Sequence, residues 1–276
     1  MKFNKHSFQI KNPLLVGICN FTPDSFSDGG KTFTRSSAMK YIKSMINNGA
    51  QIIDIGAESS KPNSTPITYQ EEIKRLSKIL PYLNYDKYLV SLDSYKIETQ
   101  EYALKKGVHI INDINGGSDE LFHLTKKYKS GLFLMHKIGT PKDMQKNLKP
   151  SKNMTKEFDN FIKKRLKILA NLNIDTKKVW FDPGIGFGKT LNQNLQLMRS
   201  LKKYSDLPIQ ILLGSSRKSW INFIDPSKTD ERLGGSLASV AHALSQGVNC
   251  FRIHDVQETN QMIKVLKVLN LSLIHI

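Results

Sequence analysis

Short apolar runs alternate along the chain with longer stretches in which apolar and charged residues recur at helical spacing. Each run stops at a cluster of polar, Gly or Pro residues, which is typical of a buried strand followed by a loop. In the clearest case, residues 14–19 lead into the polar, Gly-containing segment 20–30. The pattern predicts strands over residues 14–19, 52–55, 88–92, 108–111, 132–135, 179–181, 209–213 and 249–253.

The stretches between the runs predict helices over residues 36–48, 69–80, 96–105, 120–128, 155–172, 194–203, 236–246 and 258–269. This alternation requires parallel strands joined by right-handed crossovers, as in a doubly wound sheet or a (β/α)8 barrel. All strands of a barrel end on one face, so the polar residues that follow them meet around one ligand, whereas an open sheet leaves several apart. We therefore expect an α/β fold, a single (β/α)8 TIM barrel.

The length of the chain agrees with this fold. Its 276 residues are close to the roughly 250 that are typical of one such barrel. No Pro/Ser-rich linker or internal repeat divides the chain, and the Pro-, Lys- and Asn-rich residues 140–153 are typical of a long loop. The sequence therefore predicts one domain over residues 1–276.

The apolar content indicates where the protein resides. No apolar run approaches the ~18 residues that cross a bilayer, and the first residues lack the apolar core of a signal peptide. We expect a cytoplasmic protein that does not bind membranes. Its two cysteines are too few for a disulfide framework. If Asn20, Arg252 and His254 face the interior of the barrel, strand alternation turns Cys19 toward the helices and Cys250 inward, so we expect two free thiols.

The formal net charge of +17 raises the question of nucleic-acid binding. Proteins of that class cluster Lys and Arg on one surface, often with aromatic residues between them. Here the basic pairs and triplets are scattered over predicted helices and their ends, which is typical of solvated faces. We expect no nucleic-acid partner, although the positive field attracts anionic substrates.

Polar side chains with ligand-binding chemistry follow four of the predicted strands: Asp93, Asn112, Asp182 and Lys218. An Asp or Asn at such a position is often only the N-cap of the next helix. The ordered set, with glycines beside it, favours a ligand site at the barrel mouth. Carboxylate and amide groups of this kind suit a ligand with fixed donor and acceptor directions.

The Gly-rich segment 184–190 has a competing interpretation, because a strand, a Gly-rich loop and Lys-Thr also describe a nucleotide-binding P-loop. That motif requires Gly six residues before the lysine. The residue six before Lys189 is Pro183. The P-loop interpretation is therefore disfavoured, and the glycines are expected to let backbone approach a ligand.

Taken in order, these segments resemble the dihydropteroate synthase family, over nearly the whole chain from Asn20 to Asp255. The resemblance implies a transferase of folate biosynthesis. It condenses (7,8-dihydropterin-6-yl)methyl diphosphate with 4-aminobenzoate to give 7,8-dihydropteroate and diphosphate, with Mg²⁺ and without a protein nucleophile. The implied catalytic residues are Asp93, Asp182 and Lys218. The implied pterin-binding residues are Asp93, Asn112, Asp182, Lys218, Gly214 and Met135, and the implied 4-aminobenzoate-binding residues are Phe187, Ser216 and Lys218.

The resemblance also implies a diphosphate subsite formed by Asn20, Ser60, Arg252 and His254. Arg252 and His254 are two residues apart on a predicted strand, so their side chains share a face. Asn20 is the implied protein ligand of Mg²⁺, an ion that keeps several waters and rarely uses an all-protein cage. The implied mobile loops contain Thr22, Pro23, Asp24, Ser25, Lys61 and Pro62. The family is commonly dimeric, so we expect a homodimer.

Three departures from the family pattern are visible. Ser60-Lys61 stands where Thr-Arg is common, Ala57 where Gly is common, and Gln193 where His is common. Lysine lacks the planar fork of arginine, so we expect the second loop to hold diphosphate with less geometric definition.

Two other functions share the pterin pocket. A barrel that transfers a methyl group from a pterin to a corrinoid has no use for a diphosphate subsite, so segment 21–30, Arg252 and His254 count against it. The second alternative is a catalytically idle paralogue that binds pterin as a sequestering or regulatory protein. The intact set of Asn20, Lys218, Arg252 and His254 argues against it. Turnover with both substrates separates these alternatives.

Overall fold

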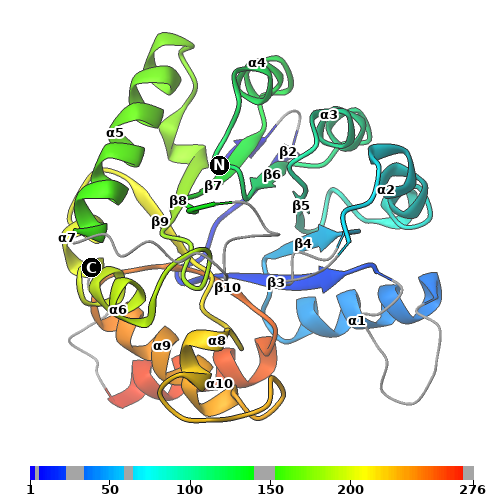
Figure 1. Ribbon diagram of the computed structural model, residues 1–276. Coiled ribbons are helices and arrows are strands. Elements are labelled where there is room, and N and C mark those ends of the chain that lie inside the picture. The colour runs from blue at the N-terminus through cyan, green and yellow to red at the C-terminus, as the bar shows by residue number, and fades with distance from the viewer. Residues whose placement is uncertain (4–5, 23–33, 59–64, 140–152, 270–276) are drawn as a thin grey trace.

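The computed structural model describes residues 1–3, 6–22, 34–58, 65–139 and 153–269. Eight parallel strands form a closed barrel in the order β10-β3-β4-β5-β6-β7-β8-β9 (Figure 1). The strands are β3 (Leu14–Asn20), β4 (Ile52–Gly56), β5 (Leu89–Asp93), β6 (Ile110–Asp113), β7 (Gly131–Met135), β8 (Val179–Asp182), β9 (Gln210–Leu213) and β10 (Cys250–Ile253). The first and last of these strands pair with each other, which confirms the (β/α)8 barrel and excludes an open sheet.

Helices surround the barrel and cover its outer face (Figure 1). The described helices are α1 (Arg35–Asn47), α2 (Tyr69–Leu76), α3 (Ile97–Lys105), α4 (Asp119–Tyr128), α5 (Met154–Asn171), α6 (Leu191–Arg199), α7 (Leu201–Ser205), α8 (Ser219–Asn222), α9 (Leu233–Ser245) and α10 (Val256–Leu269). Two 3₁₀ turns are η1 (Leu80–Tyr82) and η2 (Thr176–Lys178). In the described part of the chain, no helix combines the length and the apolarity that a membrane crossing requires.

Two predicted helices differ from the observed ones. The helix predicted over residues 69–80 ends at Leu76, and Pro81 lies in the 3₁₀ turn that follows. The helix predicted over residues 194–203 is two helices, because Ser200 leaves helical geometry and donates its hydroxyl to the carbonyl of Gln196. A serine that bonds to the backbone in this way competes with regular helix geometry.

The start of α6 explains one departure from the family pattern. Thr190 caps the helix, because its Oγ1 atom accepts from the backbone nitrogen of Gln193 at 3.3 Å. In return, the side-chain oxygen Oε1 of Gln193 accepts from the backbone nitrogen of Thr190 at 2.8 Å. This reciprocal pair is a capping box, which satisfies two backbone donors that the helix leaves free. Gln193 therefore has a structural role at this position.

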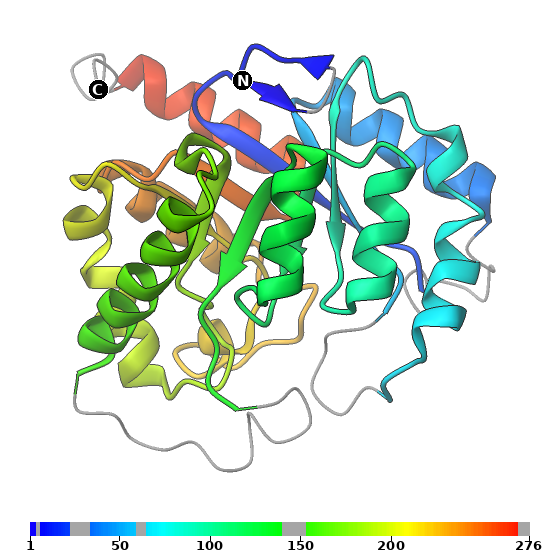
Figure 2. The same cartoon turned by 90° about the horizontal axis from the view of Figure 1, so that it is seen from above.

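An N-terminal hairpin of β1 (Lys2–Phe3) and β2 (His6–Ser7) was not expected from the sequence. It lies at the end of the barrel opposite to the strand arrowheads (Figure 2). Phe3 is fully buried there and packs into the barrel interior with residues such as Val16 and Trp180. The hairpin thus closes the bottom of the barrel and leaves the other end for a site.

Alternation along the strands produces two apolar cores. The inner core fills the lower barrel, and the outer core lies between the strands and the helices. Cys19 belongs to the outer core and Cys250 to the inner core, and both are free thiols. The predicted orientation of the two cysteines is therefore confirmed.

The burial of these thiols predicts slow modification. Burial raises the pKa of Cys19 to about 12 and raises that of Cys250 well above its ordinary value. The thiolate is the reactive form, so the folded protein should react slowly with Ellman's reagent at pH 8. The same protein in guanidinium chloride should release two equivalents quickly. Fast release of either equivalent from the folded protein would contradict the buried placement.

Candidate active site

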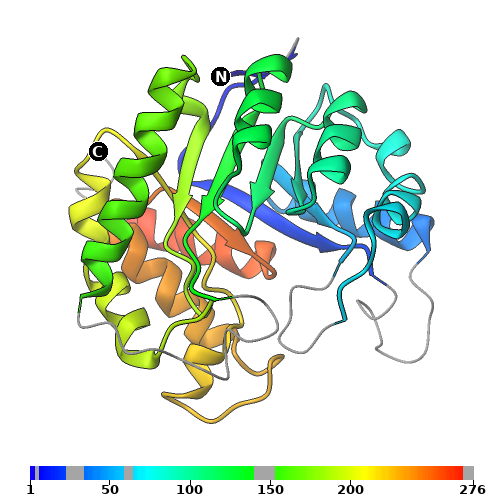
Figure 3. The same ribbon diagram turned by 45° about the horizontal axis from the view of Figure 1, so that its top comes forward.

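The strands end together at one face of the barrel (Figure 3). The polar residues noted from the sequence lie at or just after these strand ends. In the pairing register, Asn20 lies beside Gly56, Gly56 beside Asp93, and Asp93 beside Asn112. Asp182 ends β8 beside Met135. Lys218 follows β9, and His254 follows Arg252 at the end of β10. The tertiary fold thus brings these residues to one mouth.

Arg252 lies at the centre of this mouth. Its Nε atom donates to Asp54 Oδ2 at 2.6 Å, and its Nη2 atom donates to Asp93 Oδ2 at 2.5 Å. Burial lowers the pKa of the guanidinium, but Asp54 and Asp93 outweigh burial and hold it above its ordinary value. Arg252 is therefore a permanent buried cation between two acids.

The two carboxylates differ in their role in this cluster. Asp93 keeps 12% of its side chain exposed. Burial raises its pKa to about 7, with Arg252 opposing that shift. Asp54 is fully buried and also accepts from Asn112 Nδ2 at 2.9 Å. Sequence reasoning missed Asp54, although an aspartate inside the apolar run 52–55, in phase with the inward positions, was the available signal.

Asp182 and Lys218 form the opposite side of the mouth. Asp182 Oδ1 accepts from the Gly184 amide nitrogen at 2.7 Å. A Cβ atom placed on Gly214 would lie 3.2 Å from Asp182 Oδ2 and 3.6 Å from Lys218 Nζ. Gly214 therefore provides the space between this acid and this cation, which a larger residue would fill.

The burial of the two charged groups shifts their ionisation. Burial raises the pKa of Asp182, while Lys218, the Gly184 amide and Arg252 oppose the shift. Burial lowers the pKa of Lys218 to about 8, and Asp182 opposes it. Burial thus favours the neutral form of each side chain, and the attraction between the two opposite charges opposes that effect.

The Gly-rich loop after β8 supports Lys218. The Lys218 ammonium lies 4.4 Å from the centroid of the half-buried Phe187 ring, which is cation–π geometry. Lys189 donates to the carbonyls of His136, Gly184 and Phe187 at 2.8, 2.9 and 3.1 Å. All three donors of Lys189 are used to fasten the loop, so it does not face a ligand as a P-loop lysine does.

His254 is held by Ser216. Its backbone nitrogen donates to Ser216 Oγ at 3.3 Å, and its Nδ1 atom lies 3.1 Å from the same oxygen. Burial, Arg252 and Arg217 lower the pKa of His254 to about 3, so the ring is neutral near pH 7. Since Ser216 Oγ already accepts one bond, its hydroxyl is suited to donate to Nδ1, which leaves the proton on Nε2.

A further ion pair joins the ends of β9 and β10. Arg217 donates from Nε to Asp255 Oδ2 at 2.9 Å and from Nη2 to Asp255 Oδ1. Arg217 has a φ of 56°, a strained backbone geometry for a residue with a side chain. Its position between Ser216 and Lys218 means that this clamp fixes two residues of the mouth. Sequence reasoning did not single out Arg217 or this pairing.

Asn20 is the only residue that the sequence analysis assigned to a metal. Within the described residues, the side-chain amide of Asn20 makes no hydrogen bond, so its oxygen is available to a ligand. The same residues contain no group of three or more His, Cys, Asp and Glu side chains that could hold a metal ion. One amide oxygen fits an ion bound mostly by water and diphosphate.

The loop residues predicted from the sequence are described only in part. Thr22 is described and buried, whereas Pro23, Asp24, Ser25, Ser60, Lys61 and Pro62 lie outside the described residues. Ala57 packs in the outer core.

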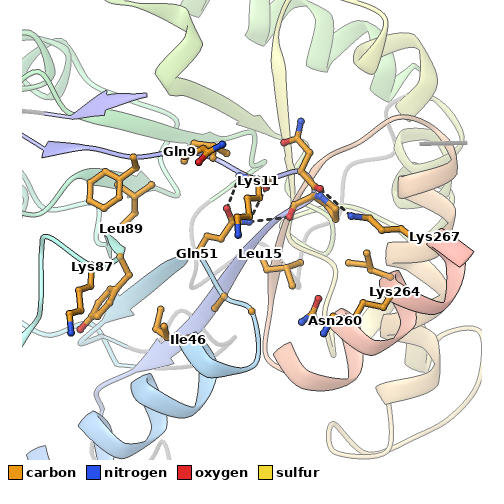
Figure 4. Close-up of a pocket in the computed structure, with 18 residues that line it drawn as sticks. Gln9, Lys11, Leu15, Ile46, Gln51, Lys87, Leu89, Asn260, Lys264 and Lys267 are labelled. Carbon is orange, nitrogen blue, oxygen red and sulfur yellow. Dashed lines mark hydrogen bonds between the residues drawn. The ribbon is translucent and has the colours of Figure 1, made fainter. Parts of the chain in front are cut away.

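A different hollow lies at the bottom of the barrel, away from the strand ends. It has a volume of about 500 Å³ and is lined by residues such as Lys11, Gln51, Lys264 and Lys267 (Figure 4). Gln51 bonds to the backbone of Lys11 and Pro13 there. None of the residues assigned to the site from the sequence lines it, so the mouth remains the candidate active site.

The glycine loop supports a stability prediction. Gly184 has a φ of 64°, and a Cβ atom there would lie 2.0 Å from the His136 carbonyl oxygen. Gly184→Ala should lower the free energy of unfolding by more than about 2 kcal/mol through strain and steric clash. A Cβ atom on Gly234, in α9, would meet nothing within 4 Å, so Gly234→Ala is the matched control and should be neutral or stabilising. Equal urea midpoints for the two variants would contradict this account of the loop.

Comparison with known proteins agrees with this geometry. Residues 16–254 match the model of the family described as pterin binding enzyme. The chain is 35% identical to dihydropteroate synthase from Clostridium beijerinckii, over 98% of this chain and 99% of that protein.

Two solved structures extend the comparison. The dihydropteroate synthase of Yersinia pestis, solved with a sulfonamide drug, superposes with a TM-score of 0.90 at 30% identity and 99% coverage of both chains. The Burkholderia cenocepacia enzyme, solved with 7,8-dihydropteroate, gives a TM-score of 0.83 at 29% identity, over 94% of this chain and 92% of that one. The family match and the similarity to dihydropteroate synthases over the whole fold, together with a barrel mouth lined by acids, an amide and buried cations, show that the chain belongs to the pterin-binding enzyme family as a dihydropteroate synthase.

Proposed function

We propose that the barrel mouth carries out the dihydropteroate synthase reaction, in which (7,8-dihydropterin-6-yl)methyl diphosphate and 4-aminobenzoate give 7,8-dihydropteroate and diphosphate. The observation that carries this assignment is the cluster of Asp93, Asn112, Asp182 and Lys218 around Arg252. The cluster offers acceptors and cations on largely buried side chains, as a pterin and an anionic leaving group require.

The acids and the amide form the pterin subsite. A pterin ring presents a guanidine-like edge of N–H donors, which matches the carboxylate of Asp182. The Asn112 amide nitrogen is already bonded to Asp54, so its oxygen is the atom turned to a ligand. Asp93 provides a third acceptor, and Met135 and Gly214 border the subsite.

The cations and polar groups near β3 and β10 form the diphosphate subsite. Arg252 provides a permanent positive charge, His254 provides a neutral N–H donor, and Ser60 is the hydroxyl proposed from the second loop. Asn20 would hold Mg²⁺, which supplies charge neutralisation at the leaving diphosphate when bound.

The 4-aminobenzoate subsite is proposed at Phe187, Ser216 and Lys218. The ring of Phe187 lies against the Lys218 ammonium and provides an apolar wall beside a cation, which suits an aromatic carboxylate. Ser216 lies against His254, so this subsite adjoins the diphosphate subsite. The B. cenocepacia relative was solved with 7,8-dihydropteroate, a molecule that joins the two halves.

The proposed mechanism is dissociative. The bond between the pterin methylene carbon and the diphosphate oxygen breaks, and the departing charge is stabilised by Arg252 and by the Nε2–H donor of His254. Asp93 and Asp182 stabilise the positive charge that develops on the pterin. The neutral amino group of 4-aminobenzoate then forms the new C–N bond and loses a proton to solvent. The residues act by orientation and by fixed charges, and none serves as a nucleophile.

Further features of the protein follow as proposals. The chain acts as one domain over residues 1–276 and is located in the cytoplasm. The proposed mobile loops that close on the substrates contain Thr22, Pro23, Asp24, Ser25, Lys61 and Pro62. A homodimer is supported by an exposed apolar stripe on α10, where Val265, Val268 and Leu269 keep 52%, 74% and 72% of their surface exposed.

The first test of the function is turnover. With Mg²⁺, the purified protein should release diphosphate only when both substrates are present, and mass spectrometry should detect 7,8-dihydropteroate. Pterin binding without turnover would indicate the idle paralogue. Methyl transfer to a corrinoid would indicate the other pterin-binding barrel.

A second test concerns Asp182. Asp182→Asn should weaken pterin binding by about tenfold to a hundredfold, because an amide replaces an acceptor by a donor opposite the ring's N–H edge. Asp113→Asn is the matched control. Asp113 also ends a strand, but its carboxylate accepts from the backbone nitrogens of Asn115 and Gly117 and is not assigned to the pterin subsite. Isothermal titration calorimetry measures both variants. Equal pterin affinity in Asp182→Asn and wild type would remove Asp182 from the subsite.

The third test is the pH dependence of kcat/KM for the pterin substrate. Ionisation of Asp93, with a pKa of about 7, should raise kcat/KM with rising pH. Loss of the Lys218 proton, with a pKa of about 8, should lower it again. The profile should therefore be a narrow bell between these values. Lys218→Arg, whose charge persists to high pH, should lose the alkaline limb, and an unchanged alkaline limb in that variant would contradict this assignment.

A further inference from the structure

Asp54 has a position that packing alone does not explain. It lies on β4 inside the barrel, one inward position below Gly56, and its side chain is completely inaccessible to solvent. Ile52, the next inward residue toward the bottom, belongs to the apolar inner core. A buried ion pair is often no more stable than apolar residues of the same volume. Moreover, Asp54 Oδ1 is buried without a partner among the described residues. Stability alone would favour an apolar residue here.

One oxygen of Asp54 contacts two groups that serve different halves of the substrate. Asp54 Oδ2 accepts from Arg252 Nε at 2.6 Å and from Asn112 Nδ2 at 2.9 Å. In the function proposed above, Asn112 belongs to the pterin subsite and Arg252 to the diphosphate subsite. Asp54 is thus the direct bridge between the two.

The bridge decides which atoms the two partners offer. A carboxylate only accepts hydrogen bonds, so Asn112 must turn its amide nitrogen toward Asp54 and its oxygen toward the mouth. A pterin N–H then meets an acceptor. The guanidinium of Arg252 is planar, and bonds from two of its nitrogens to Asp54 and Asp93 fix its plane.

We propose that Asp54 is a positioning residue that orients the Asn112 amide and the Arg252 guanidinium with one carboxylate oxygen, and thereby holds the pterin and diphosphate subsites in register. The proposal rests on the function given above, because that function assigns the two subsites. Asp54 itself lies below the mouth and is not a catalytic residue.

The test uses Asp54→Asn, which keeps the shape of the side chain and removes its charge. The introduced amide can present its nitrogen to Asn112 or to Arg252, so one of the two bonds is lost or reversed. The Kd of the pterin diphosphate with Mg²⁺, measured by calorimetry, should rise by about tenfold or more. The KM for 4-aminobenzoate should change by less than about twofold, because neither partner of Asp54 belongs to that subsite.

Ser91→Ala is the matched control. Ser91 is the β5 neighbour of Asp54 in the register, is equally buried, and its hydroxyl has no partner among the described residues. Loss of this hydroxyl should leave the pterin Kd, both KM values and the pH profile unchanged. A rise in pterin Kd in Ser91→Ala equal to that in Asp54→Asn would show that any change in this layer loosens the site, and would overturn the proposal.

The pH profile gives a readout that general structural damage would not move. The charged groups around Asp93 are Arg252 and Lys218, which favour its ionisation, and Asp54, Glu72 and Asp113, which oppose it. Asp54→Asn removes one opposing charge and leaves Arg252 to pair with Asp93 alone. The acid limb of kcat/KM should therefore move to lower pH in Asp54→Asn and stay in place in Ser91→Ala.

The outcomes separate this proposal from the proposed function. Wild-type protein that binds the pterin but forms no dihydropteroate contradicts the function, while the calorimetric Kd values still decide the role of Asp54. An unchanged Kd and an unmoved acid limb in Asp54→Asn overturn the positioning role. If Asp54→Asn does not fold, Asp54→Ser, which leaves room for a water, is measured in its place. If neither variant folds while Ser91→Ala does, Asp54 is required for folding and the proposal is overturned.

Discussion

The pairing of β10 with β3 is the constraint on which the site depends. The two strands run in parallel, with Arg252 beside Val16, and Leu14 donates its amide nitrogen to the Asn249 carbonyl at 2.7 Å where the pairing begins. Because this pairing closes the sheet, Arg252 on the last barrel strand faces acids on β4 and β5 across the interior. In an open sheet the same arginine would lie at the far edge from both.

Closure of the barrel brings opposite charges close together on largely buried side chains. The acids Asp54, Asp93 and Asp182 surround the cations Arg252 and Lys218. Each charge is tolerated because the others are near it, since isolated charges are strongly disfavoured in such surroundings. The inner apolar core and the N-terminal hairpin below provide the rigid base. Charges fixed in this way need little reorganisation when charge moves in the substrate, which is the main advantage of a preorganised site.

Loops that carry site residues are held by specific bonds to the scaffold. The Gly-rich loop after β8 is fastened by the buried ammonium of Lys189, and the loop after β9 by the Arg217–Asp255 pair. Both loops contain left-handed backbone, at Gly184 and at Arg217. Gly184 adopts this conformation without strain, whereas Arg217 is strained and is kept there by surrounding contacts. These bonds hold the segments that contain Phe187, Ser216 and Lys218.

The sequence by itself determined the barrel, because strand length, helix spacing and turn residues are local properties of the chain. It also placed Asp93, Asn112 and Asp182 at strand ends, since the polarity of a position after an apolar run is visible without any contact. The prediction of one helix over residues 194–203 was wrong, because the bond from Ser200 to Gln196 competes with helix geometry in a way that propensity does not reveal.

Only the tertiary structure decided which partners these residues have. Asp54 bonds to Arg252 although almost two hundred residues separate them, and no local pattern records a contact over such a separation. The tertiary structure likewise decided that Lys189 bonds to backbone carbonyls, including that of His136 on another segment. It also decided that His254 is neutral, because burial and the neighbouring arginines lower its pKa. The sequence thus determined which groups reach the mouth, and barrel closure decided how their charges and hydrogen bonds are shared, because those depend on distances between strands that lie far apart in the chain.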